Sequence, residues 1–147
     1  MADIAKEIIR SATVQWEGDV AHGHGTIATE SGKLQAEYSF GTRFSGDPGT
    51  NPEELLGASH AACFTMALSA ELTRAGSPPK SIETKARVYL DRIEGGFEIG
   101  KIELNAMADV PGLSGDDFAR LSRQAKDNCP LSKALRAVPI ALHATLL

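Results

Sequence analysis

An apolar segment in the middle of the chain constrains the fold more than any other feature. The length from Leu55 to Leu72 suits a helix, and apolar residues fall on nearly every side of it. These residues are Leu55, Leu56, Ala58, Ala61, Ala62, Cys63, Phe64, Met66, Ala67 and Leu68. A helix that is apolar all round is a buried helix. Because a chain of 147 residues has few elements with which to surround one, the simplest solution is a homodimer that shares this helix in a joint core.

The residues that flank this segment predict where the helix begins and ends. Asn51 is a favoured N-cap, Pro52 suits the first helical position, and Glu53 and Glu54 suit the positive end of the helix dipole. The sequence Gly-Ser-Pro-Pro at 76–79 is typical of a helix end. We therefore expect one long helix that starts at Asn51 and stops before residue 76.

Alternating apolar residues predict strands on both sides of this helix. The expected strands are 8–16, 20–29, 34–44, 82–90, 102–110 and 138–146, of which 20–29 is weakened by Gly23 and Gly25. Gly95 and Gly96 indicate a hairpin. Ser114 can cap a further helix, which Cys129-Pro130 interrupts, and 131–137 reads as another short helix. Since strands and helices do not alternate regularly, we predict an α+β fold and a single domain over residues 1–147.

Charge and composition exclude several classes of protein. The formal net charge is −4, whereas nucleic-acid-binding domains usually carry a basic surface. No uncharged apolar run approaches the ~20 residues of a membrane helix. The first ten residues, MADIAKEIIR, are charged throughout and lack the apolar core of a secretory signal. We therefore expect a cytoplasmic protein that binds neither nucleic acid nor a membrane.

Two cysteines are the main candidates for chemistry. Cys63 lies in the apolar helix, where burial raises the pKa of a thiol; it is either an inert core residue or a thiol that a nearby cation activates. Cys129 precedes Pro130 near a helix start, where backbone N–H groups and the helix dipole favour an anion. A small buried residue at a helix junction is the alternative for Cys129. In a cytoplasmic protein, free, catalytic or redox-active thiols are expected in preference to a structural disulfide.

Two residues could supply the cation that Cys63 would need. His60 lies three residues earlier on the same helix face. Arg43 lies between Phe40 and Phe44 at a predicted strand end, although an ordinary exposed arginine is the alternative. A Cys63–His60 pair also raises the possibility of a cysteine hydrolase, but the helix offers neither an orienting carboxylate nor an evident oxyanion donor.

Signals for a metal or an organic cofactor are weak. His22 and His24 fall on one face of a predicted strand, but no third ligand is indicated, so a solvated strand face is expected. His143 is expected on the outer face of the last strand. The sequence contains no phosphate-binding glycine loop, no GxSxG motif and no zinc-ligand spacing. We therefore expect no metal and no organic cofactor.

Several motifs, in order along the chain, resemble one family. The run GTNPEELLGASHAACFTMALS at 49–69 closely resembles the osmotically inducible protein C family. The related organic hydroperoxide resistance proteins share its Asn-Pro-Glu start and its Ala-Cys-Phe end. QWEG at 15–18, GHGT at 23–26, TRF at 42–44 and CPLS at 129–132 also resemble this family. Glu54, the Leu-Leu-Gly stretch and His60 favour the osmotically inducible branch, and Ser59, where alanine is frequent, is a minor departure.

The resemblance implies a fold and an activity. Members of the family are thiol peroxidases that prefer organic hydroperoxides. By this resemblance Cys63 is the peroxidatic thiolate, Cys129 the resolving thiol, Arg43 the activating arginine and Glu53 its carboxylate partner. It implies a disulfide between the two cysteines that an external dithiol reduces, with a lipoyl-type dithiol plausible from the related branch. It also implies an intertwined homodimer in which antiparallel sheets wrap buried central helices.

The spacing of two implied site residues provides a geometrical test. Glu53 and Cys63 are separated by about 15 Å along a straight helix. Arg43 must therefore bridge them, the helix must break near Gly57, or Arg43 and Glu53 must come from the other subunit; the resemblance implies the third arrangement. The competing functions are a non-enzymatic redox sensor or apolar-ligand-binding dimer that keeps both cysteines, and a purely structural stress protein.

Overall fold

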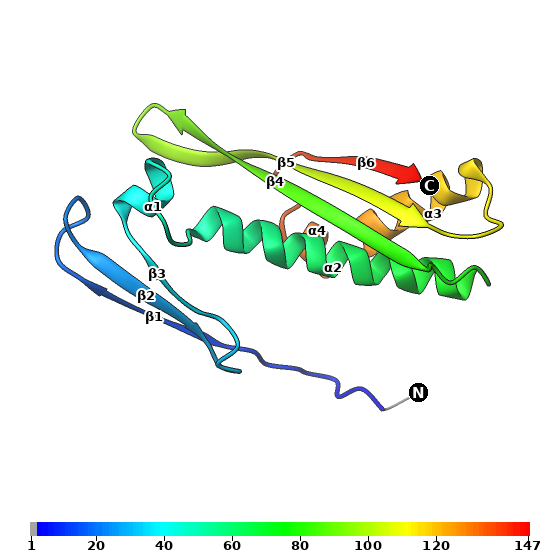
Figure 1. Cartoon of the computed structure of the whole chain (residues 1–147), viewed down its shortest axis with the longest axis horizontal. Coiled ribbons are helices and arrows are strands. Elements are labelled where there is room, and N and C mark those ends of the chain that lie inside the picture. The colour runs from blue at the N-terminus through cyan, green and yellow to red at the C-terminus, as the bar shows by residue number, and fades with distance from the viewer. Residues whose placement is uncertain (1–2) are drawn as a thin grey trace. The chain divides into compact units, whose positions relative to one another are not determined.

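The structure, a computed structural model, describes residues 3–147. The chain separates into two compact units, one ending at Pro52 and the other running from Glu53 to Leu147 (Figure 1). A single domain over residues 1–147 stays a prediction. Met1 and Ala2, at the start of the charged N-terminal segment, lie outside the described residues.

The first unit contains an antiparallel sheet in the order β1-β2-β3. Its strands are β1 (Ala12–Glu17), β2 (His24–Thr29) and β3 (Gln35–Tyr38). Gly25 lies in the central strand opposite both Trp16 and Tyr38, whose ring centroids are 5.3 Å apart. A side chain at Gly25 would collide with these two rings. The glycine that weakened the prediction of this strand is therefore what lets the two aromatic rings meet above it.

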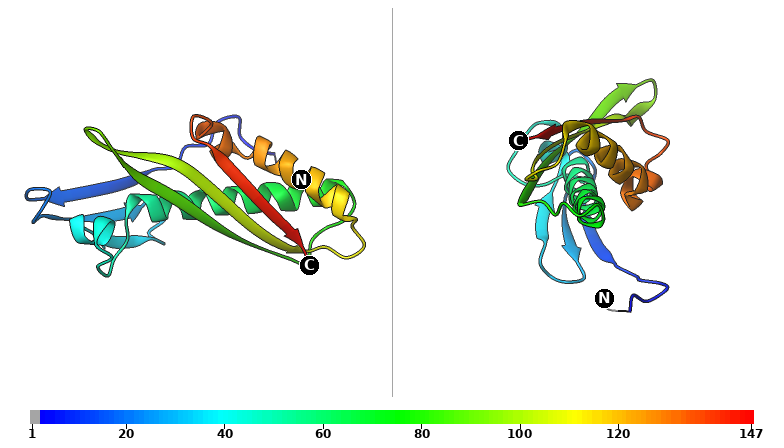
Figure 2. Two further views of the ribbon diagram at one scale, coloured as in Figure 1. Left: turned by 90° about the horizontal axis from the view of Figure 1, so that it is seen from above. Right: turned by 90° about the vertical axis from the view of Figure 1, so that its right-hand side faces the viewer.

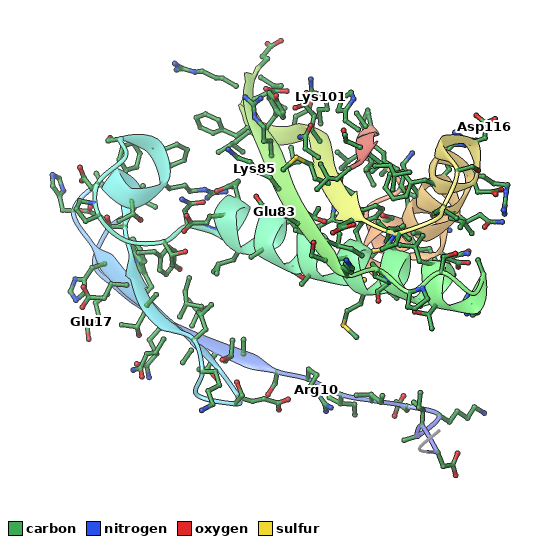
Figure 3. All side chains as sticks on the ribbon, turned by 45° about the vertical axis from the view of Figure 1, so that its right-hand side comes forward. Arg10, Glu17, Glu83, Lys85, Lys101 and Asp116 are labelled. Atoms are coloured by element: carbon green, nitrogen blue, oxygen red, sulfur yellow. The ribbon has the colours of Figure 1, made fainter. Side chains whose placement is uncertain are left out.

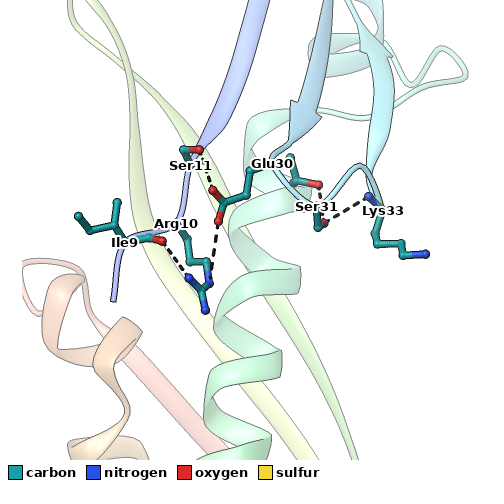
Figure 4. Close-up of polar contacts among 7 residues, drawn as sticks. Ile9, Arg10, Ser11, Glu30, Ser31 and Lys33 are labelled. Carbon is teal, nitrogen blue, oxygen red and sulfur yellow. Dashed lines mark hydrogen bonds and ion pairs between the residues drawn. The ribbon is translucent and has the colours of Figure 1, made fainter. Parts of the chain in front are cut away.

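The first strand begins later than predicted. Alternation predicted a strand from Ile8, but β1 begins at Ala12, which pairs with Thr29 at the far end of β2. The preceding residues are joined to the turn after β2 by side chains. Figure 4 shows Glu30 accepting a hydrogen bond from Ser11 Oγ at 3.1 Å and facing Arg10 Nε at 3.9 Å. Hydrogen-bonded pairing with β2, and not the apolar pattern, therefore determines where β1 starts.

The second unit contains a mixed sheet in the order β4-β5-β6. Strands β4 (Ser81–Ile93) and β5 (Gly96–Asp109) form an antiparallel hairpin, which confirms the hairpin predicted at Gly95-Gly96. Strand β6 (Ile140–Leu146) pairs with β5 in parallel. The expectation of antiparallel sheets is therefore correct for the first sheet and wrong for this pair. A parallel pair needs a long crossover connection, and helices α3 (Gly115–Asn128) and α4 (Pro130–Ala134) supply it.

The core of the second unit lies on one face of this sheet. Alternate residues of β5 are fully buried: Ile102, Leu104, Ala106 and Ala108. Against them pack the central helix α2 (Pro52–Arg74) and α3 (Figure 2). These helices contribute Phe64, Leu68, Leu72, Phe118, Leu121 and Ala125. The alternation that predicted the strand therefore also identifies which face of the sheet carries the core.

The opposite face of the sheet is polar. Glu83, Lys85 and Lys101 project from β4 and β5 in Figure 3. Lys101 Nζ lies 3.0 Å from Glu103 and 4.3 Å from the centroid of the Tyr89 ring. This face needs no further layer, because its charged groups are solvated or paired.

Helix α2 begins at Pro52, as predicted, but it is buried on one side only. Fully buried residues recur at every fourth position, at His60, Phe64, Leu68 and Leu72. On another side Met66 is 76% exposed. By length and composition alone α2 would also suit a membrane span, a test that core helices of soluble proteins pass as well. The prediction of a helix enclosed on all sides is therefore not met within this chain.

Candidate active site

Cys63 lies on α2 where that helix faces the crossover between α3 and α4. Its side chain is half-buried and packs against the core of the second unit. The thiol of Cys129 and the backbone N–H of Leu131 lie near enough to the Cys63 thiol to act on its pKa. Both cysteines are free thiols. The spacing of the two cysteines in the sequence did not show whether they meet, and in the structure they are neighbours.

Cys129 occupies the junction between two helices, as predicted. It is the C-terminal cap of α3 and the N-cap of α4, and Pro130 follows at the first position of α4. Its backbone N–H donates to Ala125 O at 2.9 Å, and its side chain makes no capping hydrogen bond. The residue is fully buried. The proline thus ends α3 and turns the chain so that the Cys129 thiol meets α2.

The second unit by itself holds Cys63 as a neutral thiol. Burial raises the pKa of Cys63, and the neighbouring Cys129 thiol raises it further. The Leu131 backbone N–H acts in the opposite direction, because it donates a hydrogen bond that favours the thiolate. All these groups belong to the second unit. A reactive thiolate at Cys63 therefore requires an additional cation.

His60 does not supply that cation. Its ring is fully buried, and burial lowers its pKa, so the neutral form is favoured at neutral pH. His60 Nε2 lies 2.9 Å from Ser132 Oγ on α4, while Nδ1 has no hydrogen-bond partner among the described residues. The ring is thus not paired with a carboxylate that would orient it, and the geometry does not favour a cysteine hydrolase.

Arg43 lies on a short helix and not at a strand end, which corrects the sequence prediction. Helix α1 (Phe40–Phe44) follows β3 directly. Ser39 Oγ accepts a hydrogen bond from Thr42 N, while Thr42 Oγ1 accepts one from Ser39 N. This capping box starts a helix although the apolar alternation continues through Phe40.

An aromatic cavity in the first unit adjoins Arg43. It has a volume of about 270 Å³. It is lined by Trp16, Val20, Tyr38, Ser39, Phe40, Arg43 and Phe44. The rings of Phe40 and Phe44 are 4.7 Å apart, and the guanidinium carbon of Arg43 lies 5.3 Å from the centroid of Phe44. This cavity combines an apolar wall with one permanently charged group.

Glu53 lies in the first turn of α2, as predicted. The helix is continuous from Pro52 to Arg74, so it does not break near Gly57. A Cβ atom at Gly57 would lie 3.4 Å from Val88 Cγ2, because the helix passes close to β4 there. One of the three arrangements left open by the sequence, a broken helix, is thereby excluded.

Of the four predicted site residues, the structure brings Cys63 and Cys129 together in the second unit. Glu53 is the first residue of that unit, and Arg43 lies in the first unit. Sequence reasoning missed the Leu131 backbone N–H and the Ser132 hydroxyl. The signal was present in the CPLS motif at 129–132, but nothing in its spacing indicates a contact with α2.

The other histidines do not form a metal site. His22 lies in a turn beside Asp19, not on a strand face with His24, which corrects the prediction. His24 lies 3.7 Å from Glu17. His143 is exposed on β6, as predicted. Within residues 3–147, no group of three or more histidine, cysteine or acidic side chains gathers to hold a metal.

Comparison with known proteins identifies close relatives. Residues 44–143 match the family model described as OsmC-like protein. The chain is 50% identical over 131 residues to peroxiredoxin OsmC of Escherichia coli strain K12, a match that covers 88% of this chain and 92% of that protein. It is 32% identical over 114 residues to the organic hydroperoxide resistance protein OhrB of Bacillus subtilis strain 168, covering 76% and 82%. Among solved structures, an organic hydroperoxide resistance protein from Elizabethkingia anophelis superposes with a TM-score of 0.74 at 26% identity, covering 97% and 100%.

Proposed function

Since this chain belongs to the OsmC family, as its motifs predicted, we propose that it is a cysteine-based peroxidase that reduces organic hydroperoxides to alcohols. The relatives named peroxiredoxin OsmC and organic hydroperoxide resistance protein support this activity. We assign Cys63 as the thiol that attacks the peroxide and Cys129 as the thiol that resolves the product. Arg43 and Glu53 are assigned as the groups that activate Cys63.

The observation that carries this proposal is the contact between the two thiols. A pair of neighbouring free cysteines, one half-buried and one fully buried, has no evident use in packing alone. It is the arrangement that a thiol peroxidase with a resolving cysteine requires, because the second sulfur must reach the first after oxidation. The Leu131 N–H, which favours the Cys63 thiolate, supports Cys63 as the residue that reacts first.

In the first step the Cys63 thiolate attacks the terminal oxygen of the hydroperoxide. The O–O bond breaks, the alkoxide leaves and takes up a proton to become the alcohol, and Cys63 becomes a sulfenic acid. Arg43 stabilises the thiolate and donates hydrogen bonds to the peroxide oxygens, since its guanidinium is always protonated. Glu53 holds the guanidinium in a bidentate pair. Because α2 is continuous, Glu53 does not touch Cys63 of its own chain, and in this proposal Glu53 acts on the thiol through Arg43.

In the second step the sulfur of Cys129 attacks the sulfur of Cys63. The S–O bond breaks, the oxygen leaves as water, and a disulfide forms. An external dithiol then reduces the disulfide in two exchange reactions and is itself oxidised to a disulfide. A lipoyl-type dithiol is the reductant we propose, and no metal or organic cofactor takes part.

The apolar surroundings of the site favour a peroxide with an alkyl or aryl group. Cys63 packs among core residues, and Phe64 follows it in the chain. Within the first unit, the cavity that Arg43 lines is also walled by aromatic rings. Burial of an apolar group in such surroundings contributes about 25 cal/mol per Å², a contribution that hydrogen peroxide cannot make. We therefore propose that organic hydroperoxides are reduced faster than hydrogen peroxide.

We also propose that the protein is an intertwined, cytoplasmic homodimer. The side of α2 that carries the exposed Met66 also carries the exposed Ala62 and is not covered by the core of the second unit. A second copy would bury it. The same assembly allows Arg43 and Glu53 to come from the partner subunit, the third of the arrangements considered from the sequence.

The test is steady-state consumption of cumene hydroperoxide and of hydrogen peroxide with excess dithiothreitol. The wild type, Cys63→Ser and Cys129→Ser are compared. We expect many turnovers by the wild type, faster with the organic peroxide, and none by Cys63→Ser. Cys129→Ser should undergo one oxidation and recycle differently. A wild type that stops after one equivalent would be a redox sensor, and a Cys63 that resists both peroxide and alkylation would be a structural residue.

A further inference from the structure

A buried hydrogen bond joins α2 to α4 beside the two cysteines. His60 Nε2 and Ser132 Oγ are 2.9 Å apart, the histidine is fully buried, and the serine is nearly so. His60 lies three residues before Cys63, and Ser132 lies three residues after Cys129. Three residues are close to one helical turn. The bond therefore connects the turns that carry the two thiols.

The buried His60–Ser132 pair is not the choice that would give this part of the core the greatest stability. A buried imidazole and hydroxyl lose their hydration, and one hydrogen bond recovers only part of that cost. His60 Nδ1 has no partner among the described residues, which leaves a further cost unrecovered. The surrounding core is apolar, and apolar residues of similar volume would fill it without either cost. The polar pair therefore calls for an explanation other than packing.

Helix α4 is short and is held by its neighbours, with Leu131 and Leu135 packed against the apolar core. It comprises only Pro130–Ala134, and a helix of this length is not stable by itself in water. The side chain of its N-cap, Cys129, makes no capping hydrogen bond. The hydrogen bond from Ser132 to His60 adds a polar contact between α4 and α2, and the position of α4 sets those of the Cys129 thiol and the Leu131 N–H beside Cys63. Because burial keeps His60 neutral, the bond to Ser132 persists through neutral pH.

We propose that His60 and Ser132 are positioning residues for the resolving step: their hydrogen bond holds α4 against α2, so that Cys129 captures the Cys63 sulfenic acid before a second peroxide does. This inference rests on the proposed function. In the productive step, the Cys129 sulfur displaces the sulfenic oxygen, which leaves as water with the thiol proton. In the competing step, the sulfenic sulfur takes an oxygen atom from a second hydroperoxide, releases a second alcohol and becomes a sulfinic acid.

The central variant is Ser132→Ala, which removes the hydrogen bond and little volume. Ser122→Ala is the matched control, because Ser122 is an equally buried serine of the same unit whose hydroxyl donates to Phe118 O within α3. Ser132→Thr should keep the hydrogen bond to His60, because threonine retains the hydroxyl and Ser132 borders a cavity of about 430 Å³ that can accept the added methyl group. His60→Leu removes the bond from the other side. Circular dichroism and thermal unfolding establish that each variant is folded.

The first measurement is mass spectrometry of Cys63 after a graded excess of cumene hydroperoxide. For Ser132→Ala and His60→Leu we expect a severalfold higher ratio of sulfinic acid to disulfide than in the wild type. This ratio compares two fates of the same sulfenic acid and does not depend on how fast that acid forms. Ser122→Ala and Ser132→Thr should match the wild type. A wild-type ratio in Ser132→Ala, or an equal rise in Ser122→Ala, would overturn the proposal.

The second measurement uses no peroxide and so separates this inference from the proposed function. The Cys63–Cys129 disulfide is equilibrated with a dithiothreitol redox buffer, and its equilibrium constant is measured by thiol alkylation. Loss of the bond should make the disulfide about tenfold less stable, which raises its reduction potential by about 30 mV. If the wild type does not react with peroxide but Ser132→Ala and His60→Leu still show this shift, the peroxidase function is refuted and the positioning role is supported. An unchanged potential in both Ser132→Ala and His60→Leu would refute the positioning role.

Discussion

The thiol of Cys63 on α2 is a neighbour of the thiol of Cys129, which lies at the junction of α3 and α4. Disulfide formation requires Cα atoms about 4.4–6.8 Å apart and a fixed torsion about the S–S bond. Two thiols that are already neighbours in the reduced protein need little movement of the helices to meet this requirement.

We therefore predict that oxidation produces a disulfide within one chain. One equivalent of cumene hydroperoxide should remove both free thiols and leave the protein monomeric on a non-reducing denaturing gel. Cys129→Ser is the control, and its Cys63 sulfenic acid should be trapped by dimedone. Disulfide-linked dimers of the wild type would show that the resolving thiol comes from another chain.

A second prediction concerns the cation at Cys63. The surroundings of Cys63 in the second unit raise its pKa, so Arg43 must lower it if the proposed activation is correct. Arg43→Gln should raise the apparent pKa for alkylation of Cys63 by at least about one pH unit. Peroxide consumption at pH 7 should fall by about tenfold or more, because the thiolate fraction falls by that factor. Arg92→Gln, at an exposed position of β4, should alter neither quantity; equal pKa values in wild type and Arg43→Gln would contradict the assignment.

A third prediction concerns the dependence of stability on pH. Burial lowers the pKa of His60 in the folded state, so the unfolded chain binds more protons below about pH 6.5. The His60 contribution to stability is therefore present above that pH and is lost as the pH falls toward the pKa of the folded state. Urea unfolding of the wild type from pH 8 to pH 5 should show this loss, and His60→Gln should lack it. His143→Gln, at an exposed position of β6, should keep the wild-type pH dependence; a loss of equal size in His60→Gln would assign the effect to other groups.

A fourth prediction concerns the buried face of α2. Leu68 is fully buried among core residues of the second unit. Leu68→Ala should lower the free energy of unfolding by about 2–5 kcal/mol, because it removes apolar contacts and leaves a cavity. Urea unfolding measures this change. A loss below about 1 kcal/mol would mean that the helix does not pack on the sheet through this face.

A fifth prediction concerns the exposed side of the same helix. Met66 is 76% exposed, and we propose that a second copy of the chain covers it. Met66→Glu should shift the dimer toward the monomer in sedimentation velocity experiments, because a carboxylate would be buried without a partner. Gln124→Glu adds the same charge at an exposed position of α3 and should leave the dimer intact. A dimer unaffected by Met66→Glu would place the interface elsewhere.

Several features of the fold could be predicted from short stretches of sequence. Pro52 marks the start of α2, Ser114 caps α3, and Gly95-Gly96 marks the hairpin, each as expected. Cys129-Pro130 separates two helices. In each case neighbouring residues determine the backbone, so the physical cause lies within a few positions of its effect. The motifs also predicted the family, since a long ordered run such as 49–69 rarely matches by chance.

Helix α1 is a local element that the sequence prediction missed, because the alternation continued through Phe40. The capping box between Ser39 and Thr42 placed Arg43 on a helix.

Other features depended on residues far apart in the chain. The parallel pairing of β5 with β6 required the crossover through α3 and α4. The contacts of Cys63 with Cys129 and of His60 with Ser132 appear only when that crossover closes on α2. The sequence by itself determined most of the local elements and which residue types could carry chemistry. The tertiary structure alone decided which of them meet, because contacts across a fold arise from the packing of whole elements and leave no mark in local spacing.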